Sequence, residues 1–289
     1  MKLAYALLFA LILLFSGIGC PGPSEPGGGA VGGAIVVNHT TTTLSAIPDN
    51  AIAQAKSKLN IAYGHTSHGS QLITGMEGLV SWKGSLYSFS STGTGGALQL
   101  RDTPFQNADD LGAPDRTTWA SSTRSYLNSN PEVNVVMWSW CGEASTATAS
   151  DISSYLSLMS KLETDFPSVR FVYMTGHLDG TGTAGNLYLR NEQIRTYCRA
   201  NGKVLFDFAD IESYNPDGVS FVDKMANDNC DYDSNGDGSN DGNWAIEWQD
   251  AHPSAWFNCS PAHTQALNGN LKAFAAWNLF ARLGGWNGL

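Results

Sequence analysis

Short apolar runs alternating with amphipathic segments constrain the fold of this chain more than any other feature. Val133–Trp140 is an apolar run of strand length, typical of a central strand in a parallel sheet. Leu59–Tyr63, Val169–Met174 and Val204–Phe208 are runs of the same kind. Helical spacing of apolar residues occurs at residues 49–59, 71–82, 117–127, 151–166, 191–200 and 267–283. This alternation predicts an α/β fold, a three-layer α/β/α sandwich with a central parallel sheet.

The segment after Leu59–Tyr63 concentrates side chains that can carry out chemistry. Gly64 ends the run, and His65, Ser67 and His68 follow directly. Ligands of open α/β sheets bind outside the carboxyl ends of the strands. Because right-handed crossovers bring these ends to one edge, we expect a common rim formed by His65, Ser67, Gly112, Cys141, His177 and Asp210. The alternative for the turn itself is structural, with its serines and histidines capping the following helix.

Composition limits the classes of function. The chain has 289 residues and a formal net charge of -10, with 15% charged residues. The acidic balance argues against nucleic-acid binding, since few side chains would neutralise phosphates. Nine tryptophans are present. Exposed tryptophans could stack on sugar rings, although we expect most of them to lie in the core.

The N-terminus has the features of an export signal. Lys2 precedes an apolar run that ends at Phe15, and small residues lead to Cys20. Cys20 occupies the place of an acylated lipoprotein cysteine, although Gly17 stands where an aliphatic residue is usual. We therefore expect a lipoprotein-type signal peptide at residues 1–20, a Gly/Pro tether at 21–34 and one folded domain at 35–289. The protein would be exported and lipid-anchored, touching the membrane only through this lipid; the alternative is a soluble secreted protein.

An acidic, glycine-rich loop spans residues 228–243 and resembles a calcium-binding loop. Oxygen ligands alternate along it, and hard cations such as Ca²⁺ require six to eight oxygens. The predicted ligands are Asp231, Asp233, Asn235, Asp237 and Asp241. Gly242 stands where an EF-hand loop has its bidentate glutamate, so Asp241 would complete the shell. We expect a structural calcium ion here; the alternative is a flexible acidic surface loop.

Four further cysteines follow the tether, at positions 141, 198, 230 and 259. An oxidising compartment favours disulfides. Cys230 and Cys259 flank one long loop, which makes them the preferred pair, although spacing alone does not fix connectivity.

In the order of these segments the chain resembles the SGNH (GDSL-like) esterase and lipase superfamily, whose fold is flavodoxin-like. Ser67 takes the place of the nucleophile that follows the first strand, and Gly112 that of the oxyanion glycine. Residues 135–142 match the third strand with its oxyanion segment, and His263 matches the histidine before the last helix.

Two positions depart from this family pattern. Cys141-Gly142-Glu143 stands where the family has an oxyanion asparagine, so a backbone N–H of Gly142 would have to replace it. Ser260 stands where an aspartate normally orients the histidine. Asp250, Asp210 or a backbone carbonyl would then have to hold His263.

The resemblance implies a serine esterase. Ser67 would attack the ester carbonyl, and His263 would act as the base. The backbone N–H groups of Ser67 and Gly112 would stabilise the oxyanion. A carbohydrate carrying acetyl esters is the expected substrate class, and no organic cofactor is expected.

Two other functions remain open. His65, His68 and His177, with Asp179 nearby, could instead hold the zinc ion of a zinc-dependent hydrolase. The chain could also be a non-catalytic, calcium-stabilised module that binds glycans at the cell surface. His252 is the alternative base if His263 points away.

Overall fold

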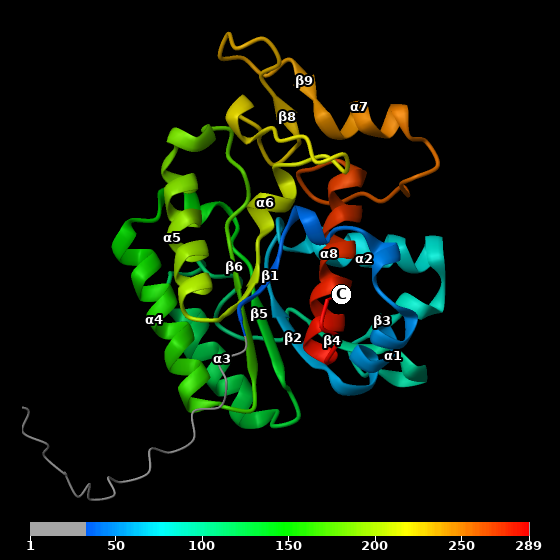
Figure 1. Ribbon diagram of the computed structural model, residues 1–289. Coiled ribbons are helices and arrows are strands. Elements are labelled where there is room, and N and C mark those ends of the chain that lie inside the picture. Colours follow the sequence, from blue (N-terminus) through cyan, green and yellow to red (C-terminus); the bar gives the residue numbers. More distant parts are fainter. Residues whose placement is uncertain (1–32, 289) are drawn as a thin grey trace, which may run out of the picture. The chain divides into compact units, whose positions relative to one another are not determined.

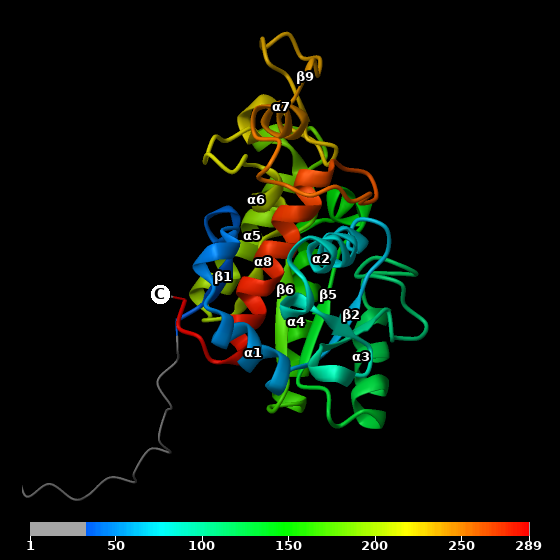
Figure 2. The ribbon, with the colours of Figure 1, turned by 90° about the vertical axis from the view of Figure 1, so that its right-hand side faces the viewer.

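The computed structural model of the chain describes residues 33–288, which form an α/β/α sandwich (Figures 1 and 2). Within these residues a seven-stranded parallel sheet has the order β1-β7-β6-β5-β2-β4-β3, and a small antiparallel pair, β8-β9, lies outside it. The strands are β1 (Ile35–Val37), β2 (Asn60–Gly64), β3 (Phe89–Ser90), β4 (Leu98–Asp102), β5 (Val135–Trp138), β6 (Arg170–Met174), β7 (Val204–Phe206), β8 (Asp231–Tyr232) and β9 (Gly242–Asn243).

Most of the α-helices lie in two layers, one on each face of the sheet, whereas α7 lies beyond the end of the sheet, as Figure 1 shows. The helices are α1 (Asp49–Lys58), α2 (Ser70–Lys83), α3 (Thr118–Ser129), α4 (Ala149–Asp165), α5 (Asn186–Ala200), α6 (Phe208–Glu212), α7 (Trp244–Ala251) and α8 (Ala266–Gly284). Helices α1, α2 and α8 pack together on one face, and α3, α4 and α5 on the other. The predicted class, an α/β fold with a central parallel sheet between helix layers, is confirmed.

The strand order fixes where a ligand can bind. The five strands β4-β2-β5-β6-β7 follow the flavodoxin-like order 2-1-3-4-5 when they are counted from β2. From β2, the chain adds β4 on one side of the sheet and then β5, β6 and β7 on the other side. The switch point therefore lies between β2 and β5, where parallel sheets open a crevice for ligands. Gly64 and Trp138 face each other at this point.

The apolar runs are continuous because both faces of each central strand are buried. Ile61 and Tyr63 of β2 join the core beneath α1, α2 and α8, whereas Ala62 between them joins the core beneath α3, α4 and α5. In β5, Met137 and Trp138 divide in the same way. Each large aliphatic side chain buried like this stabilises the fold by about 1.5–3 kcal/mol.

Helix α8 is the most deeply buried helix of the described chain, with sixteen of its nineteen residues buried. It crosses α2 at two glycines: a Cβ added to Gly75 would lie 2.0 Å from the carbonyl oxygen of Gly269. Only a residue without a side chain at position 75 allows this approach to the α8 backbone. The contact brings the start of α2, which follows Ser67, close to the turn that precedes α8.

The apolar runs predicted as strands correspond to β2, β5, β6 and β7, and the predicted helices to α1, α2, α3, α4, α5 and α8, with boundaries shifted by a few residues. Strands β1, β3 and β4 and helices α6 and α7 were not among them. The edge strands β1 and β3 have only three and two residues, and runs this short carry too little periodicity to be recognised. The predictions for the signal peptide, Cys20 and most of the tether lie outside the described residues.

The predicted disulfide between Cys230 and Cys259 is wrong. Both thiols are free in the described chain, as are those of Cys141 and Cys198. Each of the two thiols contacts the region where α8 begins instead: Cys230 Sγ lies 3.5 Å from Thr264 Oγ1, and Cys259 Sγ lies 3.6 Å from the carbonyl oxygen of Ala266. Although Cys230 and Cys259 lie on either side of one loop in the sequence, their sulfur atoms do not form a bond.

Between residues 33 and 288, helices of the length and hydropathy needed to cross a bilayer are not found.

Replacing Gly64 by alanine should destabilise the switch point. The new Cβ would lie 2.3 Å from the Trp138 ring, which is itself buried, so the strands must shift. We expect a loss of about 1–3 kcal/mol in the free energy of unfolding, measured by urea denaturation. Gly142→Ala is the control, since nothing lies within 4 Å of its added Cβ. Equal stability of the two variants would contradict this packing.

Candidate active site

A cluster of five side chains forms at the switch point. His68 follows β2, Cys141 follows β5 and His177 follows β6, whereas Asp228 and His263 come from the long segment between α6 and α8. We call these five residues the histidine cluster. The parallel sheet explains the first three, because their strands end at the same edge.

His68 is the centre of the cluster and is held at both ring nitrogens. Its Nδ1 lies 3.1 Å from Cys141 Sγ, and its Nε2 lies 2.9 Å from Asp228 Oδ2. The residue is only 7% exposed. A thiol in contact with an imidazole that also contacts a carboxylate is a known catalytic arrangement. In it the imidazole acts as the base that activates the thiol, and the carboxylate orients the imidazole.

The imidazole of His68 also stacks on two other imidazoles. The ring centroids of His68 and His177 are 3.6 Å apart with an interplanar angle of 1°, and those of His68 and His263 are 4.6 Å apart at 15°. The exposed His263 is therefore on the solvent side of the cluster, and the buried His177 on the protein side.

Asp228 remains ionised beside these rings. Its burial opposes ionisation, but the hydrogen bond from His68 and the nearby imidazoles of His177 and His68 outweigh that effect and hold its pKa below the ordinary value. An ionised carboxylate can only accept hydrogen bonds, so the proton between the two residues belongs to His68 Nε2. In the tautomer with its only proton on Nε2, His68 presents the lone pair of Nδ1 to Cys141.

Ser67, the predicted nucleophile, lies in the same place but with different partners. Its Oγ is 3.4 Å from Cys141 Sγ, and its carbonyl oxygen accepts a hydrogen bond from Ser70 Oγ at 2.6 Å. His263 shares the site through its stacking on His68. Among the described residues, Ser67 and His263 do not hydrogen-bond to each other.

Predicted auxiliary groups lie elsewhere. His65 Nε2 is 2.6 Å from Asp102 Oδ1, so His65 faces the neighbouring strand rather than His68 and His177. Asp210 binds His39, Asp250 is exposed on α7, and His252 stacks on Trp248 at 4.2 Å. None of these contacts orients His263.

The predicted oxyanion groups differ in availability. The Gly112 amide donates a hydrogen bond to Asp110 Oδ1 at 2.8 Å and is therefore engaged within its own loop. Gly142 directly follows Cys141, is exposed and has open space around its Cα. Gly142 is thus the better placed of the two.

The acidic loop uses its carboxylates internally. Asp233 accepts hydrogen bonds from the amides of Asn235, Gly236 and Gly238, and Asp241 accepts from Ser234. Asp231, Asn235 and Asp237 also bond to nearby loop or strand groups. Within residues 33–288, the one group of three or more His, Cys, Asp or Glu side chains close enough to hold a metal is His68, Asp228 and His263. Calcium binding by residues 228–243 stays a prediction.

A buried ion pair connects the segments that carry the cluster. Lys272 on α8 is fully buried; its Nζ lies 2.5 Å from Glu212 Oε1 and also donates to Gln71 Oε1. Glu212 Oε2 accepts from the amide of Leu178, next to His177, at 2.8 Å. Gln71 Nε2 donates to the carbonyl oxygen of Ala262, next to His263, at 2.6 Å. One network thus positions three of the histidine-bearing segments.

This network holds His263 in an unusual backbone conformation. His263 has φ of 61°, in the left-handed region that residues with a side chain seldom adopt. Such a residue persists only where its surroundings fix it, here through the Gln71 contact to Ala262. The conformation places the imidazole over His68, on the solvent side of the cluster.

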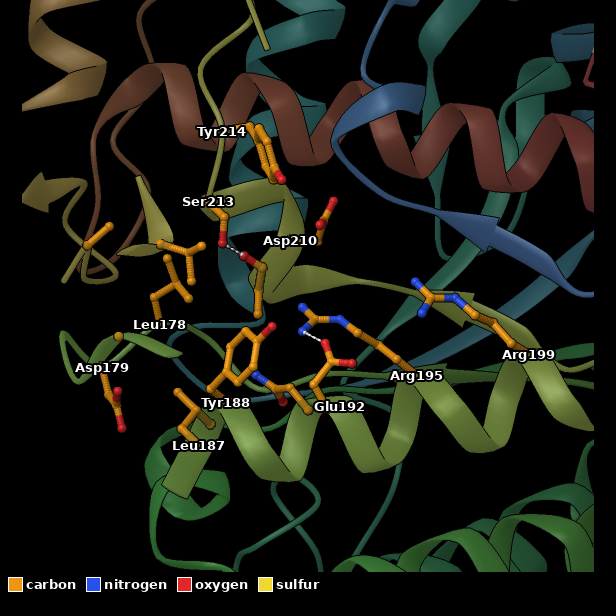
Figure 3. A pocket seen from close by; sticks show the side chains of 15 residues that line it. Leu178, Asp179, Leu187, Tyr188, Glu192, Arg195, Arg199, Asp210, Ser213 and Tyr214 are labelled. Atoms are coloured by element: carbon orange, nitrogen blue, oxygen red, sulfur yellow. Dashed lines mark hydrogen bonds and ion pairs between the residues drawn. The ribbon is translucent and has the colours of Figure 1, made fainter. Parts of the chain in front are cut away.

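A separate pocket lies between α5 and α6, as Figure 3 shows, and is lined by Tyr188, Arg195, Asp210 and Tyr214 among others. Arg195 is fixed there by Asp207 and Glu192. The pocket adjoins Leu178 and Asp179 but does not contain the histidine cluster. It offers an anchored structural arginine and no base–nucleophile pair, so the histidine cluster is the better candidate site.

The sequence does not reveal the places of Asp228 and Cys141 beside His68. Asp228 lies in a long loop whose path no periodicity indicates. Cys141 departs from the family pattern, but a thiol directly after a central strand is itself a signal for a site at the switch point.

Comparison with protein-family models gave no match, and no curated protein matched the chain significantly.

Removing the buried lysine should weaken the whole fold. Lys272→Met leaves Glu212 charged, buried and short of its main partner. We expect about 3–5 kcal/mol less free energy of unfolding, measured by urea denaturation, with partial recovery in Lys272→Met/Glu212→Gln. Lys161→Met is the matched control: its ion pair with Asp165 is exposed and should contribute about 1 kcal/mol or less. Similar losses in both lysine variants would contradict the assignment.

Proposed function

We propose that this protein hydrolyses acyl esters through a covalent intermediate formed at the histidine cluster. The observation that supports it most is the run of contacts from Cys141 Sγ to His68 Nδ1, at 3.1 Å, and from His68 Nε2 to Asp228 Oδ2, at 2.9 Å. A nucleophile within hydrogen-bond reach of a base, and a base held by a third group, is the arrangement that acyl transfer needs.

The proposed reaction has two halves. His68 Nδ1 takes the proton of the Cys141 thiol, and the thiolate attacks the ester carbonyl. The alcohol leaves with the proton returned by His68, and the acyl group stays on sulfur as a thioester. Water then gives its proton to His68 and attacks the thioester, which releases the acid and restores the thiol. Asp228 keeps the ring in the required tautomer and stabilises its charged form.

The oxyanion would be stabilised by the amide of Gly142. A backbone N–H of the residue after the nucleophile serves this purpose in other α/β hydrolases. Gly142 holds that place relative to Cys141 and is exposed. The Gly112 amide would contribute only if its bond to Asp110 opened.

Ser67 is the second candidate nucleophile. Its Oγ lies 3.4 Å from Cys141 Sγ, so a substrate carbonyl at the cluster would be near both atoms. The flavodoxin-like strand order and the places of Ser67 and His263 support the proposed likeness to SGNH hydrolases. In that version His263 would move to reach Ser67, since hydrogen bonds between catalytic groups often tighten only when substrate binds.

The proposed substrates are acetyl esters of carbohydrates outside the cell. The expected export signal and lipid anchor at Cys20 support an extracellular substrate. A cleft beside the Ser67 turn, lined by Gly64, His65, Thr66, Thr103, Phe105, Ala108 and Asp109, would admit an acyl chain or sugar edge. Tryptophan content adds nothing to this proposal, because five of the nine tryptophans are almost fully buried.

Replacing Cys141 and Ser67 separately tests the proposal. With a chromogenic acetate ester and an acetylated polysaccharide, Cys141→Ala should lower kcat by about ten-thousandfold or more, whereas Ser67→Ala should stay within about tenfold. Asp228→Asn should also lower kcat, because the carboxylate that fixes the His68 tautomer is lost. His252→Gln, outside the cluster, serves as the control.

The other outcomes identify the alternatives. If Ser67→Ala loses activity while Cys141→Ala remains active, Ser67 is the nucleophile and His263 is the base. Activity that disappears after metal chelation and returns with zinc would favour a zinc-dependent hydrolase. Glycan binding with no hydrolysis of any tested ester would favour the non-catalytic module.

A further inference from the structure

We infer that His68, Asp228 and His263 form a binding site for a divalent transition metal ion such as Zn²⁺. The inference about binding is independent of the proposed function. Its consequence, that a bound ion blocks hydrolysis, rests on the proposed function.

The three side chains have the spacing of a metal site. One ligand atom from each residue lies within 4.8 Å of the others, so modest side-chain rotations would bring all three to bonding distance. Two imidazoles and one carboxylate are a common ligand set for zinc, and three protein ligands leave a fourth position open. Nitrogen ligands favour zinc, copper, nickel or cobalt over calcium and magnesium.

His68 offers Nε2 rather than Nδ1 to the ion. Its Nε2 already lies 2.9 Å from Asp228 Oδ2, while Nδ1 points to Cys141 Sγ. Histidine ligands normally donate their other ring N–H to a nearby acceptor, which fixes the ring and its tautomer. Cys141 sulfur is placed to be that acceptor, and it therefore lies outside the metal's own ligand shell.

His177 is not one of the three ligands, although its ring stacks on that of His68. Its Nδ1 lies 2.8 Å from the carbonyl oxygen of Leu178, and because a carbonyl can only accept, Nδ1 carries the proton of this contact. Its buried Nε2 has no hydrogen-bond partner in the described chain. The metal site therefore consists of His68, Asp228 and His263, and His177 packs against it from the protein side.

Metal binding and base catalysis need opposite tautomers of the same ring. Hydrolysis needs a proton on His68 Nε2, facing Asp228, and a free lone pair on Nδ1. Metal binding needs a free lone pair on Nε2 and a proton on Nδ1. The ion also takes Asp228 as a ligand, so the base loses its orienting group. A bound Zn²⁺ should therefore inhibit the proposed reaction.

Metal titration of the metal-free protein tests the site directly. Zn²⁺ is added to the dialysed full chain and followed by isothermal titration calorimetry, where we expect one equivalent to bind. Asp228→Asn and His263→Gln should each weaken binding by about tenfold or more. Cys141→Ala should retain binding, because the sulfur is not a ligand. Asp233→Asn and His252→Gln, outside the site, should bind as the wild type does.

Each result decides a separate point. No binding to the wild-type chain, or equal binding by Asp228→Asn and His263→Gln, overturns the metal site whatever the esterase assay shows. Loss of binding in Cys141→Ala overturns the ligand assignment. Zinc that binds as expected and stimulates hydrolysis overturns the inhibitory role. If zinc binds to the wild type and to each variant as expected but no ester is hydrolysed under any condition, the metal site is supported and the proposed function is refuted.

Discussion

The buried ion pair of Lys272 and Glu212 is the interaction on which the site depends. Two charges placed in a protein interior are costly unless each is fully hydrogen-bonded. Glu212 meets this condition through Lys272 and the Leu178 amide, and Lys272 through Glu212 and Gln71. The groups that satisfy the pair are those beside the histidines. The electrostatic requirement of the core and the geometry of the cluster are therefore met by the same contacts.

Sheet topology supplies the other half of the arrangement. At the switch point β2 and β5 are neighbours, so the residues that follow them must meet. The crossing of α2 over α8, where Gly75 meets Gly269, then brings the turn before α8 to the same edge. His68 and His263 are 195 residues apart in the sequence, and this crossing is what brings them together.

Periodicity predicted the framework well and the site only in part. Apolar runs such as Val169–Met174 identify a strand because burial on both faces demands them, and the common edge of the strand ends follows from handedness alone. Ring orientation does not follow: His65 turns to Asp102 and His68 to Asp228, although they are three residues apart. Asp228 belongs to a loop placed by long-range packing, which no local pattern encodes. The Cys230–Cys259 pairing failed for the same reason.

The segment between α6 and α8, which extends beyond the end of the sheet in Figures 1 and 2, contributes both Asp228 and His263. The sheet itself contributes His68, Cys141 and His177. The sheet and the segment between α6 and α8 thus supply different residues of the histidine cluster. Replacing this one segment would remove the carboxylate and the outer imidazole together, while the strands would still hold the thiol, His68 and His177 at the edge of the sheet.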